Sequence, residues 1–320
     1  MAYNNTARLV ADIGGTNARF ALVVGDENKI TQQKSVRTQD HPTFVSAARD
    51  YLQSVGAENI HAAAIAVATP VNGDQIKMTN CPWQFSIEAA RKDLGLSQLN
   101  VLNDFEALAL SLPLIPKTEL AKIGGGEALE HAPVALLGAG TGLGVASLVW
   151  AGAKWTALPG EGGHVSISAA NEREEKIIAF TRRQFPHVSA ERLLSGMGLQ
   201  NIYHAIAALS GVEPQQLEPS FITNEALRGG DKLCVEAVEI FCAMLGTVAG
   251  NLALTLGARG GVYIGGGIVP KLGDYFARSP FRERFESKGR YKAYLAAIPT
   301  YVIHAEYPGL LGAATVLGPI

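Results

Sequence analysis

The feature that most constrains this 320-residue chain is a glycine-rich turn between two apolar runs, which occurs twice. The first copy spans Asp12-Ile13-Gly14-Gly15-Thr16-Asn17-Ala18-Arg19, with apolar residues at 9–11 before it and at 20–24 after it. Apolar runs on both sides of a glycine pair predict a β-hairpin near the N-terminus. Glycines leave backbone N–H groups open to an anion, and the Thr16 hydroxyl adds a donor. Taken alone, this copy favours an ordinary hairpin turn.

The second copy, Gly138-Ala139-Gly140-Thr141-Gly142-Leu143-Gly144, also lies between apolar runs, at 134–137 and 145–149. Thr16 and Thr141 are 125 residues apart (141 − 16 = 125), about the length of one domain. A third cluster, Gly265-Gly266-Gly267, follows the apolar run 262–264. Glycine turns that recur at strand ends predict two similar halves that hold one nucleotide. The chain has no Gly-Lys dipeptide and no Gly-x-Gly-x-x-Gly, which excludes a Walker A loop and a Rossmann turn.

Composition narrows the class of protein. A hydrophobic content of 48% and a charged content of 18% are typical of a globular protein with real cores. A net charge of −2 predicts no basic surface for nucleic acid or for an anionic membrane. Three cysteines without a Cys-x-x-Cys, and no signal-type segment, favour a reducing cytoplasm. The uncharged run 240–258 is long enough to span a membrane, but its flanking glutamates and Asn251 favour a buried helix.

Apolar periodicity and turn residues predict the order of elements along the chain. In the first half we expect strands at 29–37, 62–68 and 99–103, helices at about 42–55, 86–95 and 104–112, and a hairpin at Asn72-Gly73. The segment 113–133, rich in proline and glycine, is the best domain boundary. In the second half we expect helices at about 172–183, 190–194, 199–209 and 231–256, then a strand at 301–303 and a helix at 309–317.

Taken together, these segments resemble the bacterial ATP-dependent glucokinases of the hexokinase/actin-like ATPase superfamily. The similarity extends essentially from end to end. It rests on the three glycine clusters and on Asn103-Asp104-Phe105, Pro159-Gly160-Glu161-Gly162-Gly163-His164 and His187-Val188-Ser189-Ala190-Glu191. The resemblance implies an α/β, actin-like (hexokinase/RNase H-like) two-domain fold with a central cleft. The small domain would comprise 1–112 plus about 303–320, and the large domain 113–302.

Asn103-Asp104 lies where a predicted strand ends and a predicted helix begins. Asp104 could therefore be simply a helix N-cap. The resemblance implies instead that Asp104 is the general base that accepts the proton of a hexose 6-hydroxyl. Phosphoryl transfer is loose, so such a base mostly orients the hydroxyl and takes its proton late. Asn103 would bind a neighbouring hydroxyl, since an amide both donates and accepts.

The same resemblance implies that Glu161, His164 and Glu191 bind sugar, with Asn103 and Asp104. Carboxylates accept hydrogen bonds from adjacent hydroxyls, and a histidine ring offers one donor and one acceptor. Taken one at a time, each of the three residues could simply occupy a solvent-exposed position in a loop, strand or helix. Together they indicate a polyol pocket. Asn80 and Trp83 resemble another family segment near the sugar, although a Pro-Trp turn could be plain packing.

Nucleotide binding is implied, by the same resemblance, for Ala11, Asp12, Ile13, Gly14, Gly15, Thr16, Thr141, Gly142, Gly265 and Gly266. Asp12 would face a phosphate-bound Mg²⁺ directly or through water. Zinc is not expected, because no cysteine follows His164 before Cys234, which leaves no usual spacing of zinc ligands. The sequence therefore predicts a cytoplasmic ATP:D-glucose 6-phosphotransferase that uses ATP and Mg²⁺. We also expect a homodimer that binds neither nucleic acid nor membrane.

Four alternatives stay open. The chain could phosphorylate another hexose, or it could use polyphosphate in place of ATP. It could be a non-catalytic sugar sensor of the same fold, although the presence of Asp12 and Asp104 counts against that. A filament-forming or chaperone-type ATPase of this fold would not need the polar set of Glu161, His164 and Glu191.

Overall fold

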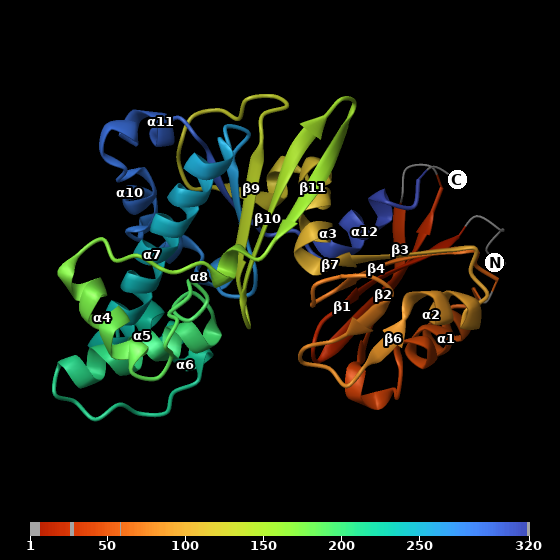
Figure 1. The fold of residues 1–320 in the computed structure, drawn as a ribbon, viewed down its shortest axis with the longest axis horizontal. Coiled ribbons are helices and arrows are strands. Elements are labelled where there is room, and N and C mark those ends of the chain that lie inside the picture. Colours follow the sequence, from red (N-terminus) through yellow and green to blue (C-terminus); the bar gives the residue numbers. More distant parts are fainter. Residues whose placement is uncertain (1–6, 26–28, 58, 319–320) are drawn as a thin grey trace. The chain divides into compact units, whose positions relative to one another are not determined.

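The computed structural model describes residues 7–25, 29–57 and 59–318, and its chain divides into two units (Figure 1). Unit 1 comprises Met1–Pro116 and Ala305–Ile320, so it contains both ends of the chain. Unit 2 is the continuous segment Lys117–His304.

In the described part of unit 1, five strands form one sheet in the order β3-β2-β1-β4-β7. The hairpin of β1 with β2, and the pair of β2 with β3, are antiparallel, whereas β4 runs parallel to both β1 and β7. The carboxyl ends of β1, β4 and β7 therefore meet at one edge of the sheet. The strands are β1 Arg8–Ile13, β2 Asn17–Val24, β3 Lys29–Arg37, β4 Ala62–Val67 and β7 Gln98–Asn103.

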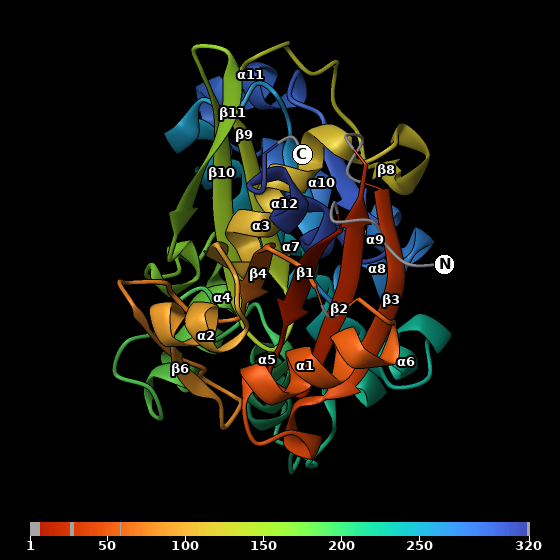
Figure 2. The same ribbon diagram turned by 90° about the vertical axis from the view of Figure 1, so that its right-hand side faces the viewer.

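Helices cover both faces of this sheet. Leu9, Ala11 and Ile13 of β1 point into a core shared with α1 and α2, whereas Val10 lies in a core with α12. Figure 2 shows α12 beside α3 on that second face. The helices are α1 Phe44–Ser54, α2 Ile87–Asp93, α3 Asp104–Ser111 and α12 Pro308–Thr315, with the short helices η1 Thr38–Asp40 and η2 Leu112–Leu114 and the small hairpin of β5 Gln75–Lys77 with β6 Gln84–Ser86.

Most elements predicted for this half are confirmed, including the strand at 29–37 and the helix that Ser86 caps through a bond from the Ala89 N–H. The hairpin predicted at Asn72-Gly73 is wrong. Its preceding strand, β4, pairs with β1 and β7, and residues 68–74, all of them described, contain no strand. The hairpin lies further along the chain, between β5 and β6. Burial of β4 inside the sheet decides its partners, and a local turn motif does not.

Unit 2 repeats the arrangement of antiparallel strands followed by parallel ones. Its described residues form a sheet of six strands in the order β11-β10-β9-β12-β13-β8, in which β12 is parallel to β9 and β13. The glycine turn 140–142 joins β9 to β10, as predicted. The strands are β8 Leu120–Lys122, β9 Val134–Ala139, β10 Leu143–Ala151, β11 Lys154–Gly160, β12 Val262–Gly265 and β13 Thr300–Ile303.

Helices account for much of the rest of unit 2. They are α4 Glu172–Arg182, α5 Gly196–Leu209, α6 Pro219–Arg228, α7 Lys232–Leu256, α8 Val269–Leu272, α9 Asp274–Arg278, α10 Phe281–Glu286 and α11 Lys292–Ala296, with the short helices η3 Lys117–Glu119, η4 Gly162–His164 and η5 Gly289–Tyr291. The helix predicted at 190–194 is wrong, because these residues form turns. The Glu191 N–H donates to the Gly163 carbonyl oxygen, and Ser195 caps α5. The sequence analysis missed α6, of which only Ile222 and Ala226 are buried, and it also missed the short helices α8 to α11.

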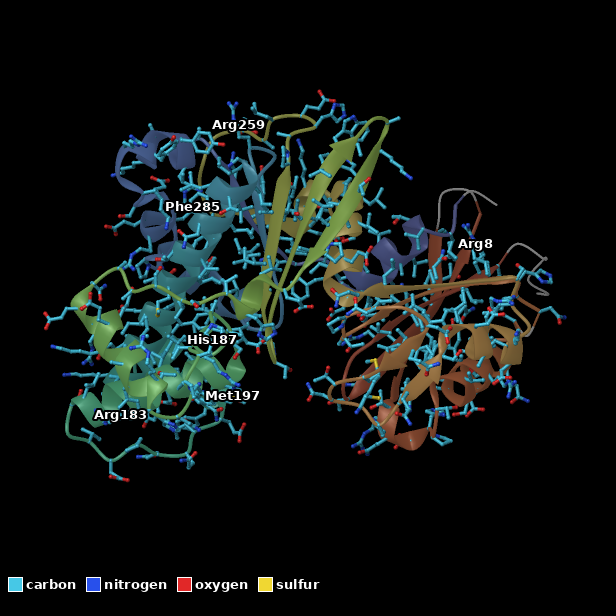
Figure 3. All side chains as sticks on the ribbon, viewed as in Figure 1. Arg8, Arg183, His187, Met197, Arg259 and Phe285 are labelled. Carbon is cyan, nitrogen blue, oxygen red and sulfur yellow. The ribbon has the colours of Figure 1, made fainter. Side chains whose placement is uncertain are left out.

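The long apolar helix α7 passes a length and composition test for a membrane span, yet 72% of its apolar window is buried inside the protein. Its small residues let the neighbouring helix approach, as predicted. A Cβ on Gly250 would lie 2.6 Å from the carbonyl oxygen of Phe285 in α10, and Phe285 lies beside α7 in Figure 3. The arrangement supports the prediction of a buried core helix.

Candidate functional site

The glycine turn of unit 1 is held by its own backbone and by Thr38. The Gly14 N–H donates to the Asn17 carbonyl oxygen at 2.9 Å, which closes the turn between β1 and β2. The buried Thr38 hydroxyl donates to the Gly15 carbonyl oxygen at 2.8 Å. Asn80 packs so close that a Cβ on Gly15 would lie 2.8 Å from the Asn80 Cβ. The turn at 14–16 is therefore fixed, whereas Ala11 and Ile13 are buried strand residues before it.

Asp12 lies near the end of β1, directly opposite Arg19 of β2. The Arg19 Nη1 atom is 3.5 Å from the Asp12 Oδ2 atom, and the Arg19 guanidinium also lies over the Tyr307 ring at 5.6 Å. Burial raises the pKa of the Asp12 carboxyl, and the charge and hydrogen bond of Arg19 act in the opposite direction. Asp12 is thus a half-buried carboxyl, with 23% of its side chain exposed, whose anionic form is stabilised by a neighbouring cation.

Asn103 and Asp104 occupy the junction of β7 with α3, as predicted. Asn103, and not Asp104, is the N-cap of α3. Its Oδ1 atom accepts from the N–H groups of Phe105 and Glu106 at 2.9 and 3.3 Å, and its Nδ2 atom donates to the Thr69 carbonyl oxygen at 3.3 Å. Asp104 is the first helical residue, and its Oδ1 atom accepts from the Phe105 N–H at 2.9 Å. Capping by Asn103 leaves Asp104 free for a different role.

Burial, with the negative charge of Asp12 as the next contribution, raises the pKa of the Asp104 carboxyl to about 6. Hydrogen bonds from Phe105 and Asn103 oppose the shift without cancelling it. A general base works best when its pKa is close to the pH of the reaction. The sequence predicted which carboxyl stands here, but its pKa depends on packing across strands that are distant in the sequence.

The glycine turn of unit 2 is closed by a hydrogen bond from the Gly140 N–H to the Gly142 carbonyl oxygen at 2.8 Å. The end of β12 lies alongside it, since Gly265 pairs with Gly138 and the Ile268 N–H donates to the Ala139 carbonyl oxygen at 3.1 Å. The structure therefore brings the turn, with Thr141 and Gly142, next to the third cluster at Gly265 and Gly266.

The three proposed sugar ligands of unit 2 lie close together. Glu161 and His164 lie at the two ends of one helical turn, with the Glu161 Oε2 atom 3.8 Å from the His164 Nε2 atom. The Glu191 N–H donates to the Gly163 carbonyl oxygen, inside the same turn, at 2.9 Å. The side chains of Glu161 and His164 are 63% and 60% exposed, so both are accessible to a ligand. Glu191, 27 positions beyond His164 (191 − 164 = 27), is thus bonded through its backbone to the turn that carries Glu161 and His164.

Other residues show what sequence reasoning missed. Trp83 is a core residue, because it is 1% exposed and its Nε1 atom donates to the His41 carbonyl oxygen at 2.9 Å. Arg19 and Thr38 received no individual role in the sequence analysis. The position of Arg19 opposite Asp12 follows from the register of the predicted hairpin, but the contact of Thr38 depends on the path of the chain after β3.

The described residues contain no group of three or more His, Cys, Asp or Glu side chains that could hold a metal ion. Mg²⁺ does not require such a group, because it is commonly bound by one or two carboxylates together with waters and substrate phosphates. The half-buried carboxyl of Asp12 beside a glycine turn fits that donor set. The expectation that no zinc is bound stays a prediction.

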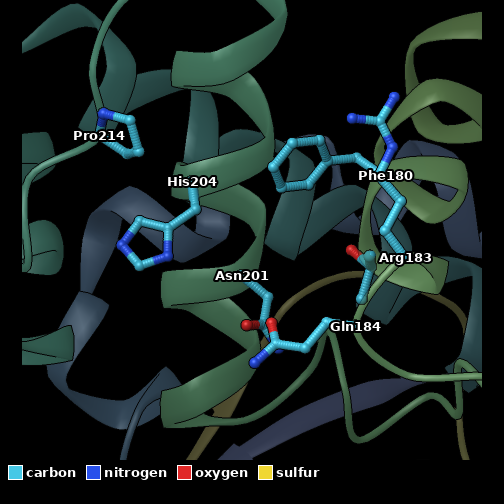
Figure 4. Close-up of a pocket in the computed structure, with 7 residues that line it drawn as sticks. Phe180, Arg183, Gln184, Asn201, His204 and Pro214 are labelled. Carbon is cyan, nitrogen blue, oxygen red and sulfur yellow. The ribbon is translucent and has the colours of Figure 1, made fainter.

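Two cavities of unit 2 differ in their relation to these residues. A cavity of about 430 Å³ lies between α4 and α5 and contains none of the predicted site residues; Figure 4 shows Phe180, Asn201 and His204 among those that line it. A smaller cavity of about 180 Å³ is lined by Val145 and Gly162, and so adjoins the turn that carries Glu161 and His164.

Comparison with known proteins identifies the family. A family model described as glucokinase matches residues 9–319. The chain belongs to the glucokinase family. It is 55% identical to the glucokinase of Chromobacterium violaceum over 307 residues, which cover 96% of this chain and 88% of that protein. It is 52% identical to a glucokinase of Neisseria meningitidis serogroup B, with 97% and 94% coverage. The bifunctional protein glk of Burkholderia pseudomallei is 51% identical, but the match covers only 48% of that protein.

Solved structures agree on the fold of this glucokinase. The glucokinase from an Antarctic psychrotroph superposes with a TM-score of 0.88 at 36% identity, covering 98% of this chain and 99% of that one. A ROK family glucokinase from Streptomyces griseus, in complex with glucose and AMPPNP, has a TM-score of 0.64 at 20% identity, covering 97% and 98%. At 20% identity, the Streptomyces griseus structure shows only that the fold is shared. The predicted α/β, actin-like fold is confirmed.

Proposed function

We propose that the protein is an ATP:D-glucose 6-phosphotransferase of the cytoplasm. The observation that carries the proposal is the 55% identity to a glucokinase over 96% of the chain. The small and large domains of the enzyme correspond to unit 1 and unit 2. The proposed roles are divided between them, with the base on unit 1 and most of the sugar ligands on unit 2.

Asp104 is the proposed general base. The glucose 6-oxygen forms its bond to the γ-phosphorus while the bond to the leaving oxygen of ADP breaks, and Asp104 takes the proton of the 6-hydroxyl. A pKa of about 6 supports this role, because the carboxyl is then mostly ionised at neutral pH and still basic enough to accept a proton. The neighbouring N-cap, Asn103, has one N–H donor left after its bonds to Phe105, Glu106 and Thr69. Asn103 therefore binds the sugar as a donor.

In unit 2, Glu161, His164 and Glu191 bind the sugar hydroxyls. The Oε2 atom of Glu191 already accepts from the Leu143 N–H at 2.9 Å, so Oε1 is the oxygen that accepts from glucose. Glu161 and His164 are exposed and close to each other, which suits a pair of adjacent hydroxyls.

The two glycine turns bind the phosphates of ATP through backbone N–H groups and the hydroxyls of Thr16 and Thr141. Gly265 and Gly266 lie beside the second turn and flank the adenosine. Asp12 would hold Mg²⁺, directly or through water, and the bound ion would supply positive charge beside the phosphates. We propose that the enzyme acts as a homodimer.

A coupled assay that detects glucose 6-phosphate tests the proposal. We expect turnover with glucose and ATP in the presence of Mg²⁺, and much lower kcat/KM with mannose, fructose or galactose, or with polyphosphate as the donor. A preference for another sugar or for polyphosphate would identify one of the two neighbouring kinase functions instead. Glucose binding by calorimetry without any turnover would identify a sugar sensor.

Asp104→Asn tests the role of the base. The substitution keeps the shape of the side chain but removes its ability to accept a proton, so we expect kcat to fall by roughly 10²-fold or more. The KM for glucose should change far less. Asp93→Asn, at an exposed position at the end of α2, is the matched control and should leave kcat unchanged. An Asp104→Asn enzyme with nearly normal kcat would rule out the assignment.

A further inference from the structure

Glu191 and Ser195 connect three segments of unit 2 that the proposed function places around different substrates. The Glu191 N–H donates to the Gly163 carbonyl oxygen at 2.9 Å, in the turn that carries Glu161 and His164. The Leu143 N–H, at the end of the glycine turn, donates to the Glu191 Oε2 atom at 2.9 Å. One residue thus contacts the sugar-binding turn and the phosphate-binding turn.

Ser195 fixes the backbone of Glu191. Its side chain is 1% exposed and makes two hydrogen bonds: the hydroxyl donates to the Glu191 carbonyl oxygen at 2.8 Å and accepts from the Gly198 N–H at 3.0 Å. The second bond caps α5. In addition, the N–H of Gly196, the first residue of α5, donates to the Gly140 carbonyl oxygen at 2.8 Å. The start of α5 is therefore bonded both to Glu191 and to the phosphate-binding turn.

These segments are tightly packed against one another. A Cβ on Gly142 would overlap the Glu191 carboxylate, and a Cβ on Gly163 would overlap the Leu143 carbonyl oxygen. The carboxylate lies directly on the turn, with no side chain between them. Because protein interiors are close-packed, a displacement of the Glu191 carboxylate is transmitted to residues 140–143.

We propose that Ser195 is a positioning residue that couples hexose binding at Glu191 to the conformation of the nucleotide-binding turn at 140–143. The inference rests on the proposed function, since it takes Glu191 as a sugar ligand and the turn as a phosphate ligand. A hexose hydroxyl that binds Glu191 Oε1 restrains the carboxylate, and Oε2 then restrains the Leu143 N–H. Ser195 holds the backbone of Glu191 in place, so that a restraint on the carboxylate reaches the turn at 140–143 and is not lost in movement of the Glu191 backbone.

The consequence is a coupling between two binding equilibria, which is reciprocal by thermodynamic necessity. Glucose should raise the affinity for a nucleotide, and the nucleotide should raise the affinity for glucose by the same factor. Without the Ser195 hydroxyl, Glu191 can bind a sugar without holding the turn. Each ligand should then still bind alone, but the gain in affinity when both are present should be smaller.

The experiment measures the dissociation constant of Mg²⁺·AMPPNP by calorimetry, with and without saturating glucose. For the wild-type protein we expect glucose to tighten nucleotide binding at least about fivefold, within the usual range of such couplings. In Ser195→Ala this factor should fall at least about threefold, with each single-ligand affinity changed less than that. Ser195→Thr keeps the hydroxyl and the cap, and should keep the wild-type factor.

Ser86→Ala is the matched control, because Ser86 caps α2 in unit 1 through a bond from the Ala89 N–H at 3.0 Å. It removes the same kind of cap and should leave the coupling factor unchanged. If Ser195→Ala does not fold, Ser195→Gly replaces it, since glycine is a tolerated N-cap without a hydroxyl. A wild-type coupling factor in Ser195→Ala or Ser195→Gly would overturn the inference, as would the absence of coupling in the wild type. Failure of the wild-type protein to bind or phosphorylate glucose would overturn the proposed function itself.

Discussion

Asp12 lies near the end of β1 and Asp104 directly follows β7; both carboxyls are half-buried, and the charge of the first adds to burial in raising the pKa of the second to about 6. Arg19 stabilises the anionic form of Asp12, because its guanidinium lies 3.5 Å from the Asp12 Oδ2 atom. A cation at Asp12 would reduce the charge that acts on Asp104. The basicity of Asp104 therefore depends on what Asp12 binds.

The pH dependence of the rate follows from this pKa. As the pH falls through about 6, Asp104 takes up a proton; if Asp104 is the base, as proposed, log kcat/KM should then decline on the acid side. The measurement is a pH profile of kcat/KM for glucose between pH 5 and pH 8. The residual activity of Asp104→Asn should lack this decline, which separates the carboxyl from the titration of ATP. A wild-type profile that stays flat down to pH 5 would contradict the prediction.

The same shift has a consequence for stability. The folded pKa of Asp104 lies above its ordinary value of 3.8, so the folded state binds a proton between about pH 4 and pH 6 that the unfolded state has lost. This contribution to the free energy of unfolding is present at low pH and is lost as the pH rises to 6. Above pH 6 the buried charge costs on the order of 1–3 kcal/mol. Asp104→Asn should therefore raise Tm at pH 7.5, measured by calorimetry, and the gain should shrink towards pH 4. A lower Tm at pH 7.5 would contradict it.

At the level of single elements, local sequence predicted strands and helix starts well, because each depends on neighbouring residues. The runs at 62–68 and 99–103 are apolar, and this alone predicts strands without knowledge of their partners. Ser86 caps its helix through a contact with Ala89, three residues further along the chain. The prediction failed at 190–194 because Ser195 has an extended backbone that starts α5, so only one turn forms before it, in which the Leu194 N–H donates to the Ala190 carbonyl oxygen. The alternative that Asp104 is only the N-cap of α3 is wrong, because the capping contacts belong to Asn103. Which of several neighbouring polar residues starts a helix is not visible in the sequence.

The packing of α12 on α3 depends on one glycine. A Cβ on Gly312 would overlap the carbonyl oxygen of Ala107, so the two helix backbones touch at this point. Gly312→Ala should force the helices apart and lower the free energy of unfolding of unit 1 by roughly 1–3 kcal/mol or more. Chemical denaturation monitored by circular dichroism gives the measurement. Gly160→Ala is the control, because the nearest atom there is 3.9 Å away. Equal stability of the two variants would show that the helices adjust freely.

For the molecule as a whole, the repeated glycine turn predicted two similar halves, and each unit has a hairpin of this kind followed by parallel strands. The assignment of α12 to unit 1 could not follow from local pattern, because the helix is separated from β7 by all of unit 2. The resemblance to the bacterial glucokinases supplied this assignment. The division of the site residues could be predicted in part: Asp12, Asn103 and Asp104 precede the boundary at 113–133, and the remaining polar set follows it.

Transfer of a phosphoryl group to the glucose 6-oxygen requires the base, the sugar ligands and the γ-phosphate to act on one glucose molecule. Asp104 belongs to unit 1, whereas Glu161, His164 and Glu191 belong to unit 2. We therefore expect catalysis to require a movement of the units that glucose itself induces. Water can attack ATP wherever a sugar hydroxyl can, so an enzyme whose assembly depends on sugar contacts suppresses ATP hydrolysis in the absence of glucose.

Two measurements test this dependence on the sugar. Glucose should lower the radius of gyration measured by small-angle scattering, and Mg²⁺·AMPPNP alone should lower it less. Basal ATP hydrolysis should be very slow, and xylose should accelerate it, because a five-carbon sugar occupies the proposed sugar site but offers no 6-hydroxyl and leaves room for water. Glu161→Gln should weaken the response to xylose, whereas Asp93→Asn should not. If glucose leaves the radius of gyration unchanged and xylose leaves ATP hydrolysis unchanged, sugar binding does not control assembly of the site, even in an active glucokinase.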